Sequence, residues 1–221
     1  MWKLLFLIAL FVLPALWFYL KHRSHGTQST VVICGPSESG KTALLLYLTR
    51  GKYVQSQTSQ SVNKVSLKVG AKMVSVIDTP GSFRLLPESM KYIEQAQALV
   101  FVVDSSDKQS FKMAAQLLVD IILNPKIIAA RPRMLFLANK KDVIGSRDVE
   151  AVLHFVQLDA ERILKAYKSE SHMKKIPNET MPLLQSLTQG TFSIEHTPLQ
   201  VTLGTSSVSS GNVDDVLKFM E

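Results

Sequence analysis

One segment constrains the fold and the chemistry of this chain more than any other. Its eight residues match the phosphate-loop pattern G-x-x-x-x-G-K-[ST] and read Gly35, Pro36, Ser37, Glu38, Ser39, Gly40, Lys41 and Thr42. The apolar run 31–34 precedes this loop and the helix-forming run 43–48 follows it, so the loop joins a strand to a helix. In that context an ordinary glycine turn is the weaker explanation.

The loop has the chemistry of an anion site. Its glycines let the backbone curl tightly, so that successive N–H groups point inward at the start of a helix. Lys41 can reach the β- and γ-phosphates of a nucleotide, and the Thr42 hydroxyl can ligate Mg²⁺. The sequence therefore predicts a nucleoside triphosphate site.

The amino-terminal segment has a different character. Residues 4–20 are nearly all apolar and carry no charge, and as a helix they would span about 26 Å, just enough for a hydrocarbon core. Residues 21–23 are basic, which places the rest of the chain in the cytosol. We predict a transmembrane anchor with its basic flank over residues 1–23 and a linker over 24–29. A cleaved signal peptide is the alternative, but the apolar run is long for one and charges crowd the cleavage position.

The length, net charge and cysteine count of the chain narrow its possible binding partners and exclude some kinds of structure. The 221 residues suit one globular domain plus an appendage, and the formal net charge of +7 could favour nucleic acid or an anionic membrane surface. No aromatic-interleaved basic cluster occurs, so we expect a membrane and no direct nucleic-acid contact. The single cysteine, Cys34, excludes an internal disulfide framework.

Apolar runs alternate with amphipathic ones along residues 30–221. We expect strands over 30–34, 65–69, 73–77, 98–103, 134–138 and 199–203, and helices over 41–49, 111–122, 149–167 and 213–220. Ser146 is the expected N-cap of the third of these helices. Residues 169–198 are polar and predict an inserted loop region, with a short helix near 181–187. This order predicts an α/β fold with a mostly parallel six-stranded sheet flanked by helices.

A second motif follows the third expected strand. Asp78 begins a D-x-x-G sequence that ends at Gly81, in the place where ligands bind open α/β sheets. The Asp78 carboxylate could hold Mg²⁺ opposite Thr42, and the Gly81 N–H could approach a γ-phosphate without a Cβ clash. Alone, D-x-x-G is a common turn. Downstream of a phosphate loop it predicts a γ-phosphate sensor.

A third motif follows the fifth expected strand and reads N-K-x-D, from Asn139 and Lys140 to Asp142. Guanine presents N–H donors at N1 and N2, which one carboxylate can accept, whereas adenine offers an acceptor at N1 and would leave a carboxylate unmatched. Asp142 therefore predicts guanine specificity. Asn139 could tie its loop to the phosphate loop or reach the base, and the Lys140 stem could lie along the ring.

The order of these three motifs resembles the small GTPases. Within them the chain resembles the signal recognition particle receptor beta subunit in the stretches 57–59, 101–105 and 138–142, and in its expected anchor. This resemblance implies that Thr58 is the switch threonine, a ligand of Mg²⁺ and of the γ-phosphate. Ser56, Ser59 and Ser61 remain alternatives. It also places the base-supporting loop at Thr205, Ser206 and Ser207.

The resemblance further implies a function. It implies GTP and Mg²⁺ as cofactors and a heterodimer with the receptor alpha subunit. It places the chain in the endoplasmic reticulum membrane, with a cytosolic GTP-binding domain that serves co-translational protein targeting. Contact with a ribosome or translocon stays open. Ser82 stands where many small GTPases have the glutamine that orients the attacking water, so we expect slow intrinsic hydrolysis.

Two other functions fit parts of the sequence. An Arf/Sar-like vesicle-traffic GTPase fits the run 103–107, but the expected anchor and Ser82 favour the receptor subunit. A P-loop ATPase or nucleoside kinase fits the phosphate loop, but Asp142 disfavours it.

Overall fold

A six-stranded sheet forms the centre of the protein. The computed structural model describes residues 29–55, 59–168 and 177–221. Within them the strand order is β2-β3-β1-β4-β5-β6. The antiparallel pair β2–β3 forms one edge, and the other neighbouring strands run parallel, which confirms the predicted sheet. The strands are β1 (Ser29–Cys34), β2 (Asn63–Val69), β3 (Lys72–Asp78), β4 (Ala98–Asp104), β5 (Arg133–Asn139) and β6 (Gln200–Thr205).

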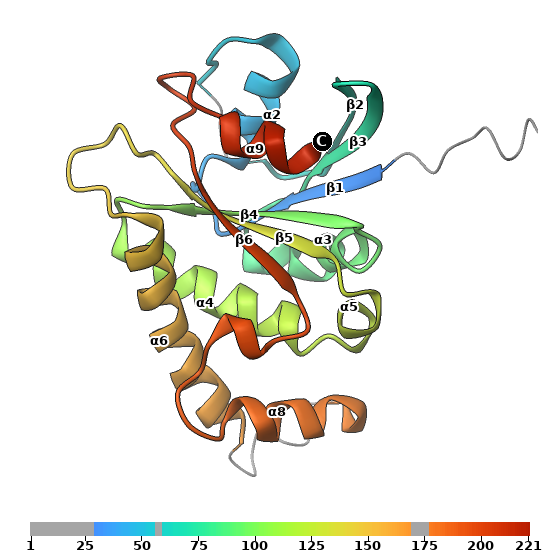
Figure 1. Cartoon of the computed structure of the whole chain (residues 1–221), viewed down its shortest axis with the longest axis vertical. Coiled ribbons are helices and arrows are strands. Elements are labelled where there is room, and N and C mark those ends of the chain that lie inside the picture. The colour runs from blue at the N-terminus through green and yellow to red at the C-terminus, as the bar shows by residue number, and fades with distance from the viewer. Residues whose placement is uncertain (1–28, 56–58, 169–176) are drawn as a thin grey trace, which may run out of the picture.

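Helices cover both faces of this sheet (Figure 1). One face carries α3 (Leu86–Ile93), α4 (Lys108–Ile122), α5 (Pro125–Ala130) and α6 (Val149–Tyr167). The other carries α2 (Lys41–Arg50) and α9 (Asp214–Met220). Alternate residues of a strand enter different cores: Phe101 packs toward α4, and Val100 packs on the opposite side. The central strands are therefore apolar on both faces, as buried parallel strands are.

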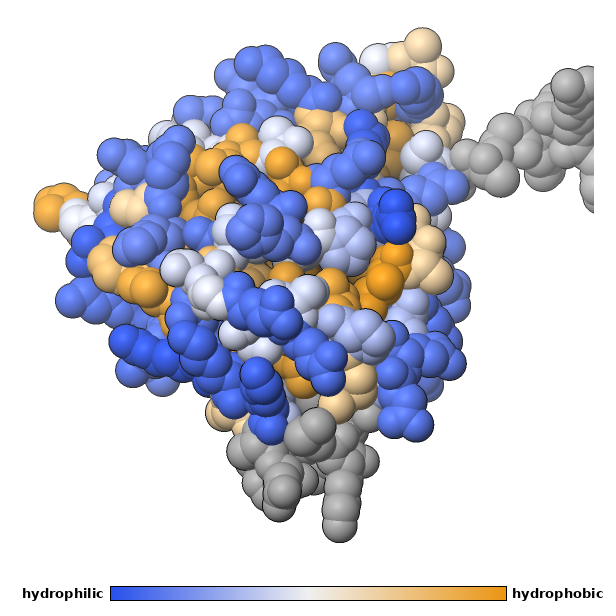
Figure 2. All heavy atoms as spheres, turned by 60° about the horizontal axis from the view of Figure 1, so that its bottom comes forward, coloured by the Kyte–Doolittle hydropathy of each residue, from blue (hydrophilic) through white to orange (hydrophobic). Residues whose placement is uncertain are grey.

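The sheet brings the predicted motifs to one edge. The phosphate loop follows β1, and Asp78 and Asn139 are the last residues of β3 and β5. Because these strands are parallel, their carboxyl ends meet on the same side of the sheet. Figure 2 turns the lower helices of Figure 1 toward the viewer, and polar residues cover most of that face with apolar ones in separate patches.

The start of α6 differs from the prediction. Its N-cap is Asp148 and not Ser146. The Ser146 hydroxyl instead donates to the Lys141 carbonyl at 3.1 Å, which stabilises the loop before the helix. A second difference lies after α4, where α5 was not among the expected helices and begins at the N-cap Asn124. The Asn124 side chain accepts from the backbone N–H groups of Lys126 and Ile127.

The described part of the predicted inserted loop is folded against the core. It contains η2 (Asn178–Thr180), η3 (Ile194–His196) and α8 (Met181–Leu187), the short helix expected there. Backbone N–H groups at Phe192 and Ile194 donate to the side chains of Glu161 and Gln157 on α6. The apolar residues that turn inward are Leu184, Leu187, Phe192 and Ile194. The sequence did not predict this packing, because residues 169–198 are mostly polar.

The expected anchor over residues 1–23 lies outside the described residues, as do residues 24–28 of the linker. Within 29–221, apart from the two undescribed gaps, no helix has the length and apolar character needed to cross a bilayer.

Replacing Leu184 with Ala tests the packing of α8. The side chain is 1% exposed, so its removal should lower the free energy of unfolding by about 2–5 kcal/mol in urea denaturation. The neighbouring exposed residue Gln185 provides the control, because Gln185→Ala should change stability by less than about 0.5 kcal/mol. Equal effects of the two substitutions would contradict the packing.

Candidate nucleotide-binding site

A cavity of about 450 Å³ opens at the carboxyl ends of the strands. All three predicted motifs contribute to its lining, as do the loop after α2 and the loop after β6. The lining residues from the motifs are Glu38, Gly40, Lys41, Thr42, Thr79, Gly81, Asn139, Lys140 and Asp142. A volume of this size is in the range of small-molecule pockets.

Two phosphate-loop glycines are required by close contacts. A Cβ on Gly35 would lie 2.1 Å from the Val102 carbonyl oxygen, and one on Gly40 would lie 2.3 Å from Nδ2 of Asn139. Both residues also have positive φ angles, 145° and 94°, which favour glycine. Between them, Ser37 is half-buried and Glu38 is exposed, with φ at 63°. The loop is therefore pressed between β4 and the N-K-x-D loop.

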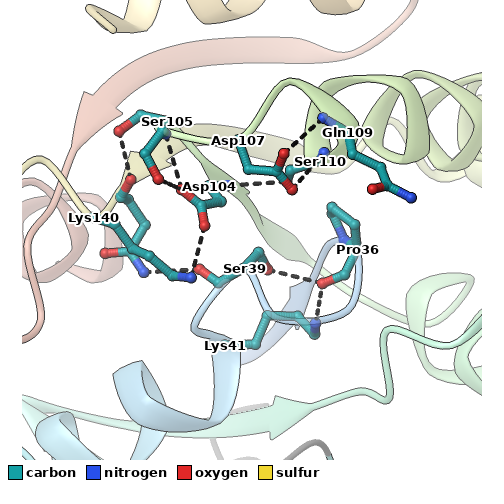
Figure 3. Close-up of polar contacts among 11 residues, drawn as sticks. Pro36, Ser39, Lys41, Asp104, Ser105, Asp107, Gln109, Ser110 and Lys140 are labelled. Atoms are coloured by element: carbon teal, nitrogen blue, oxygen red, sulfur yellow. Dashed lines mark hydrogen bonds and ion pairs between the residues drawn. The ribbon is translucent and has the colours of Figure 1, made fainter. Parts of the chain in front are cut away.

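Lys41 lies under this loop in a buried position. Its side chain is 6% exposed, and its Nζ donates to the Pro36 carbonyl oxygen at 2.6 Å (Figure 3). The buried Ser39 hydroxyl donates to the same oxygen at 3.0 Å. Burial lowers the pKa of Lys41 to about 8, although the nearby Asp78 carboxylate acts in the opposite direction. A bound anion would stabilise the charged form.

Hydroxyl and carboxylate oxygens meet beside the phosphate loop. Thr42 Oγ1 donates to Oδ2 of Asp78 at 2.7 Å and lies 2.8 Å from the hydroxyl of Ser59. Asn63 Nδ2 also donates to Asp78, at 3.3 Å. The second Asp78 oxygen, Oδ1, is buried and has no hydrogen-bond partner among the described residues. Burial raises the pKa of Asp78. An oxygen set with an unsatisfied carboxylate fits a divalent cation such as Mg²⁺.

The predicted switch residue Thr58 lies outside the described residues. The structure places Ser59, one of its alternatives, against Thr42 in the same pocket.

Gly81 packs directly on the phosphate loop. A Cβ there would lie 2.5 Å from Nζ of Lys41 and 2.6 Å from the backbone nitrogen of Ser37. The D-x-x-G segment therefore contacts the phosphate loop at a position where only glycine fits.

Asn139 joins three loops. Its Nδ2 donates to the Ser39 carbonyl oxygen at 2.8 Å, and its Oδ1 accepts from the Ser206 hydroxyl at 2.9 Å. The Ser206 backbone N–H donates to the Ala138 carbonyl at 2.9 Å. Asn139 thus ties the phosphate loop to the loop after β6. Contact with the phosphate loop was one of the two roles predicted for it. Thr205, at the end of β6, uses its N–H to donate to Asp215 at 2.9 Å.

Asp142 is supported by serines of the loop after β6. Its Oδ1 accepts from the Ser207 hydroxyl at 2.5 Å. This hydrogen bond, followed by one from Ser209, lowers the pKa of Asp142, so the carboxylate is ionised at neutral pH. An ionised carboxylate in the pocket can only accept hydrogen bonds. Sequence reasoning placed Ser207 in the supporting loop but missed Ser209.

Lys140 is held by a residue that sequence reasoning did not place in the site. Its Nζ forms an ion pair with Oδ2 of Asp104 at 2.7 Å (Figure 3). The other Asp104 oxygen accepts from the N–H of Ser106 at 2.9 Å. The register that pairs Asp104 with Asn139 across β4 and β5 brings the two partners together. The available signal was a carboxylate ending a fully apolar strand.

Comparison with known proteins identifies the family. A sequence model described as "Signal recognition particle receptor beta subunit" matches residues 26–201. The chain belongs to that family. The mouse (Mus musculus) signal recognition particle receptor subunit beta is 27% identical over 217 residues, covering 94% of this chain and 78% of the relative. This membership favours the receptor subunit over the Arf/Sar-like alternative.

Solved structures share the fold. A structure of the mammalian SRP receptor superposes with a TM-score of 0.68 at 22% identity, covering 86% of this chain and 97% of the other. A second, the SRb-GTP/SRX complex from Chaetomium thermophilum, gives a TM-score of 0.63 at 21% identity, covering 83% and 92%. The predicted small GTPase fold is therefore confirmed.

Removing the Asn139 amide should destabilise the whole site. Asn139→Ala leaves the buried Ser39 carbonyl and the Ser206 hydroxyl without partners, and we expect a loss of about 2–4 kcal/mol in the free energy of unfolding. Ser206→Ala removes only one of these hydrogen bonds and should cost about 1 kcal/mol. The order of the two losses in chemical denaturation is the test. A larger loss for Ser206→Ala would contradict the bridging role of Asn139.

Proposed function

We propose that this chain is a membrane-anchored GTP-binding switch, the beta subunit of a signal recognition particle receptor. The observation that carries the nucleotide assignment is Asp142, an ionised carboxylate in the same cavity as Lys41. Guanine can donate two hydrogen bonds to that carboxylate, from its N1 and N2 groups, whereas adenine cannot. A P-loop ATPase or a nucleoside kinase that binds adenine would not require a carboxylate at this position.

In this proposal, different groups at one end of the pocket bind the phosphates and the Mg²⁺ ion. Backbone N–H groups of residues 37–42 and the Lys41 ammonium bind the phosphates, and the Gly81 N–H contacts the γ-phosphate. Thr42 and Asp78 would hold Mg²⁺, which neutralises charge on the β- and γ-phosphates when bound. We also propose Thr58 as the switch ligand, with Ser59 as its described neighbour.

The base end is held by the remaining predicted residues. Asn139 fixes the loops, the Lys140 stem covers the ring, and Asp142 reads the base edge. Thr205, Ser206 and Ser207 support this end indirectly. The N–H groups of Thr205 and Ser206 are occupied by Asp215 and by the Ala138 carbonyl, and the Ser206 and Ser207 hydroxyls hold Asn139 and Asp142.

The output of the switch is a docking surface. A γ-phosphate would order the segments around Ser59 and Gly81, because both already contact the phosphate loop or its helix. A relative is named as a complex of the GTP form with SRX, which supports the receptor alpha subunit as partner here. We propose that residues 1–23 anchor the chain in the endoplasmic reticulum membrane by a single span, with residues 30–221 in the cytosol. Hydrolysis is slow, because Ser82 is too short to orient water unaided.

Affinity capture with the full chain in detergent tests the function. The chain loaded with a non-hydrolysable GTP analogue should retain the receptor alpha subunit, and the GDP-loaded chain should retain much less. Identical recovery in both nucleotide states would contradict a switch.

Changing Asp142 to Asn should redirect base preference. The amide presents donors where guanine also presents donors, so GTP affinity should fall by a factor of about 100 or more. Xanthosine triphosphate has a carbonyl at C2 and should bind better to this variant than GTP does. Competition against a fluorescent guanine nucleotide measures both values. Unchanged GTP affinity would exclude Asp142 from the base contact.

Nucleotide affinity should depend on the protonation of Lys41. Phosphate binds the charged form, and the pKa of about 8 in the free protein means that this form is fully present only below that pH. Affinity should therefore be constant near pH 7 and fall by up to about tenfold per unit as pH rises above about 8. Calorimetric titration at several pH values measures this fall. Lys41→Met should bind more weakly and lose the fall, and a wild-type affinity that rises with pH would contradict the assignment.

A further inference from the structure

The chain enters the folded domain on the side opposite the nucleotide. Ser29 begins β1 and pairs with Val74, close to the turn between β2 and β3. Figure 1 shows the entry into β1, this turn, α5 and the carboxyl terminus at one end of the molecule. The nucleotide pocket lies at the other end, because it forms at the carboxyl ends of the parallel strands.

Basic side chains gather at the end where the chain enters. They come from the ends of β2 and β3 beside their turn, the C-cap of α5, the first residue of β5 and the last turn of α9, and all are exposed. We call them the anchor-side face: Lys68, Lys72, Arg131, Arg133 and Lys218. The register places Lys68 opposite Met73 in the hairpin. The guanidinium of Arg133 lies 5.2 Å from the ring centroid of Phe219, which brings the start of β5 beside the end of α9.

Acidic groups nearby leave most of this charge uncompensated. Glu94 is already paired with Lys126 at 2.7 Å. An oxygen of the Glu221 main-chain carboxyl group accepts from Lys72, and the acidic Glu221 side chain also lies at this face, so Lys72 is compensated. Within the described part of the chain, Lys68, Arg131 and Lys218 form no ion pair. Beside them, Met73 is 51% exposed and offers an apolar side chain at the rim.

The proposed anchor brings this face to a bilayer. Only residues 24–28 separate the anchor segment from Ser29, and five residues reach at most about 18 Å. So short a tether lets the anchor-side face approach the lipid headgroups to within one Debye length, about 8 Å at physiological salt. Anionic headgroups attract basic side chains within that distance, and apolar side chains favour the interface.

We infer that the anchor-side face docks on an anionic membrane surface, an inference that rests on the anchor in the proposed function. Docking holds β1 and the β2–β3 turn against the headgroups. The nucleotide pocket then faces away from the bilayer, where a cytosolic partner can reach it.

Energy transfer from the protein to the lipid surface tests this docking. The only native cysteine, Cys34, is 1% exposed, so a dye can be attached selectively to Ala71→Cys in the β2–β3 turn of the full chain. The chain is reconstituted into vesicles that carry a headgroup acceptor, with either phosphatidylserine or phosphatidylcholine as the main lipid. Transfer should be higher with phosphatidylserine, and high salt should remove the difference. A dye on Ile144→Cys, in a fully exposed loop beside the pocket, should show little transfer with either lipid.

Charge reversal provides the matched control. Reversing three unpaired residues of the face, by Lys68→Glu, Arg131→Glu and Lys218→Glu, should abolish the dependence on lipid charge. Lys64 lies at the pocket end of the same strand as Lys68, and Lys108 and Lys112 lie in the first turns of α4. Their reversal to Glu should leave the dependence intact.

Three results would overturn the inference, and they are distinguishable. Transfer independent of lipid charge, with the chain still embedded after an alkaline wash, rejects the docking face and leaves the anchor in place. Release of the chain by that wash rejects the anchor as well. A dye response to soluble RNA but not to lipid charge rejects a membrane surface and indicates nucleic acid.

Discussion

The site depends on a single buried side chain, the amide of Asn139. It donates to the phosphate loop at Ser39 and accepts from the loop after β6 at Ser206. Gly40 has no Cβ, and this absence is what lets the amide approach the phosphate loop. Because the amide is 2% exposed, water does not replace these hydrogen bonds. One residue at the end of β5 therefore fixes the relative positions of the phosphate and base ends.

The charged forms of Lys41 and Asp78 would be more stable with a ligand bound than in the free protein. Lys41 and Asp78 are both buried, and burial shifts each pKa toward the neutral form. Oδ1 of Asp78 also has no partner among the described residues. A nucleotide with Mg²⁺ would supply the anion that Lys41 lacks and the cation that Asp78 lacks. In contrast, Asp142 is already stabilised as a carboxylate by Ser207, so the carboxylate that we propose to bind the base is ionised before binding.

Sequence patterns predicted the sheet and the three motifs because each depends on local chemistry. Continuous apolar runs identified β4 and β5, and glycine spacing identified the phosphate loop. The packing of the segment after α8 was not predictable, because it depends on Glu161 and Gln157 of α6 accepting from the distant backbone N–H groups of Phe192 and Ile194. The ion pair between Asp104 and Lys140 likewise depends on strand register. The predicted N-cap of α6, Ser146, was wrong, because the helix begins two residues later, after Asp148, and Ser146 belongs to the preceding loop, where its hydroxyl donates to the Lys141 carbonyl.

In the proposed function, one cavity binds a triphosphate through Lys41 and selects guanine through hydrogen bonds to Asp142. Isothermal titration of the full chain in detergent with GTP and with ATP, in the presence of Mg²⁺, tests it most directly. GTP should bind with a dissociation constant of about 1 μM or tighter, and ATP should bind at least about 100-fold more weakly. No heat of GTP binding at micromolar concentrations, or equal affinity for both nucleotides, would contradict it.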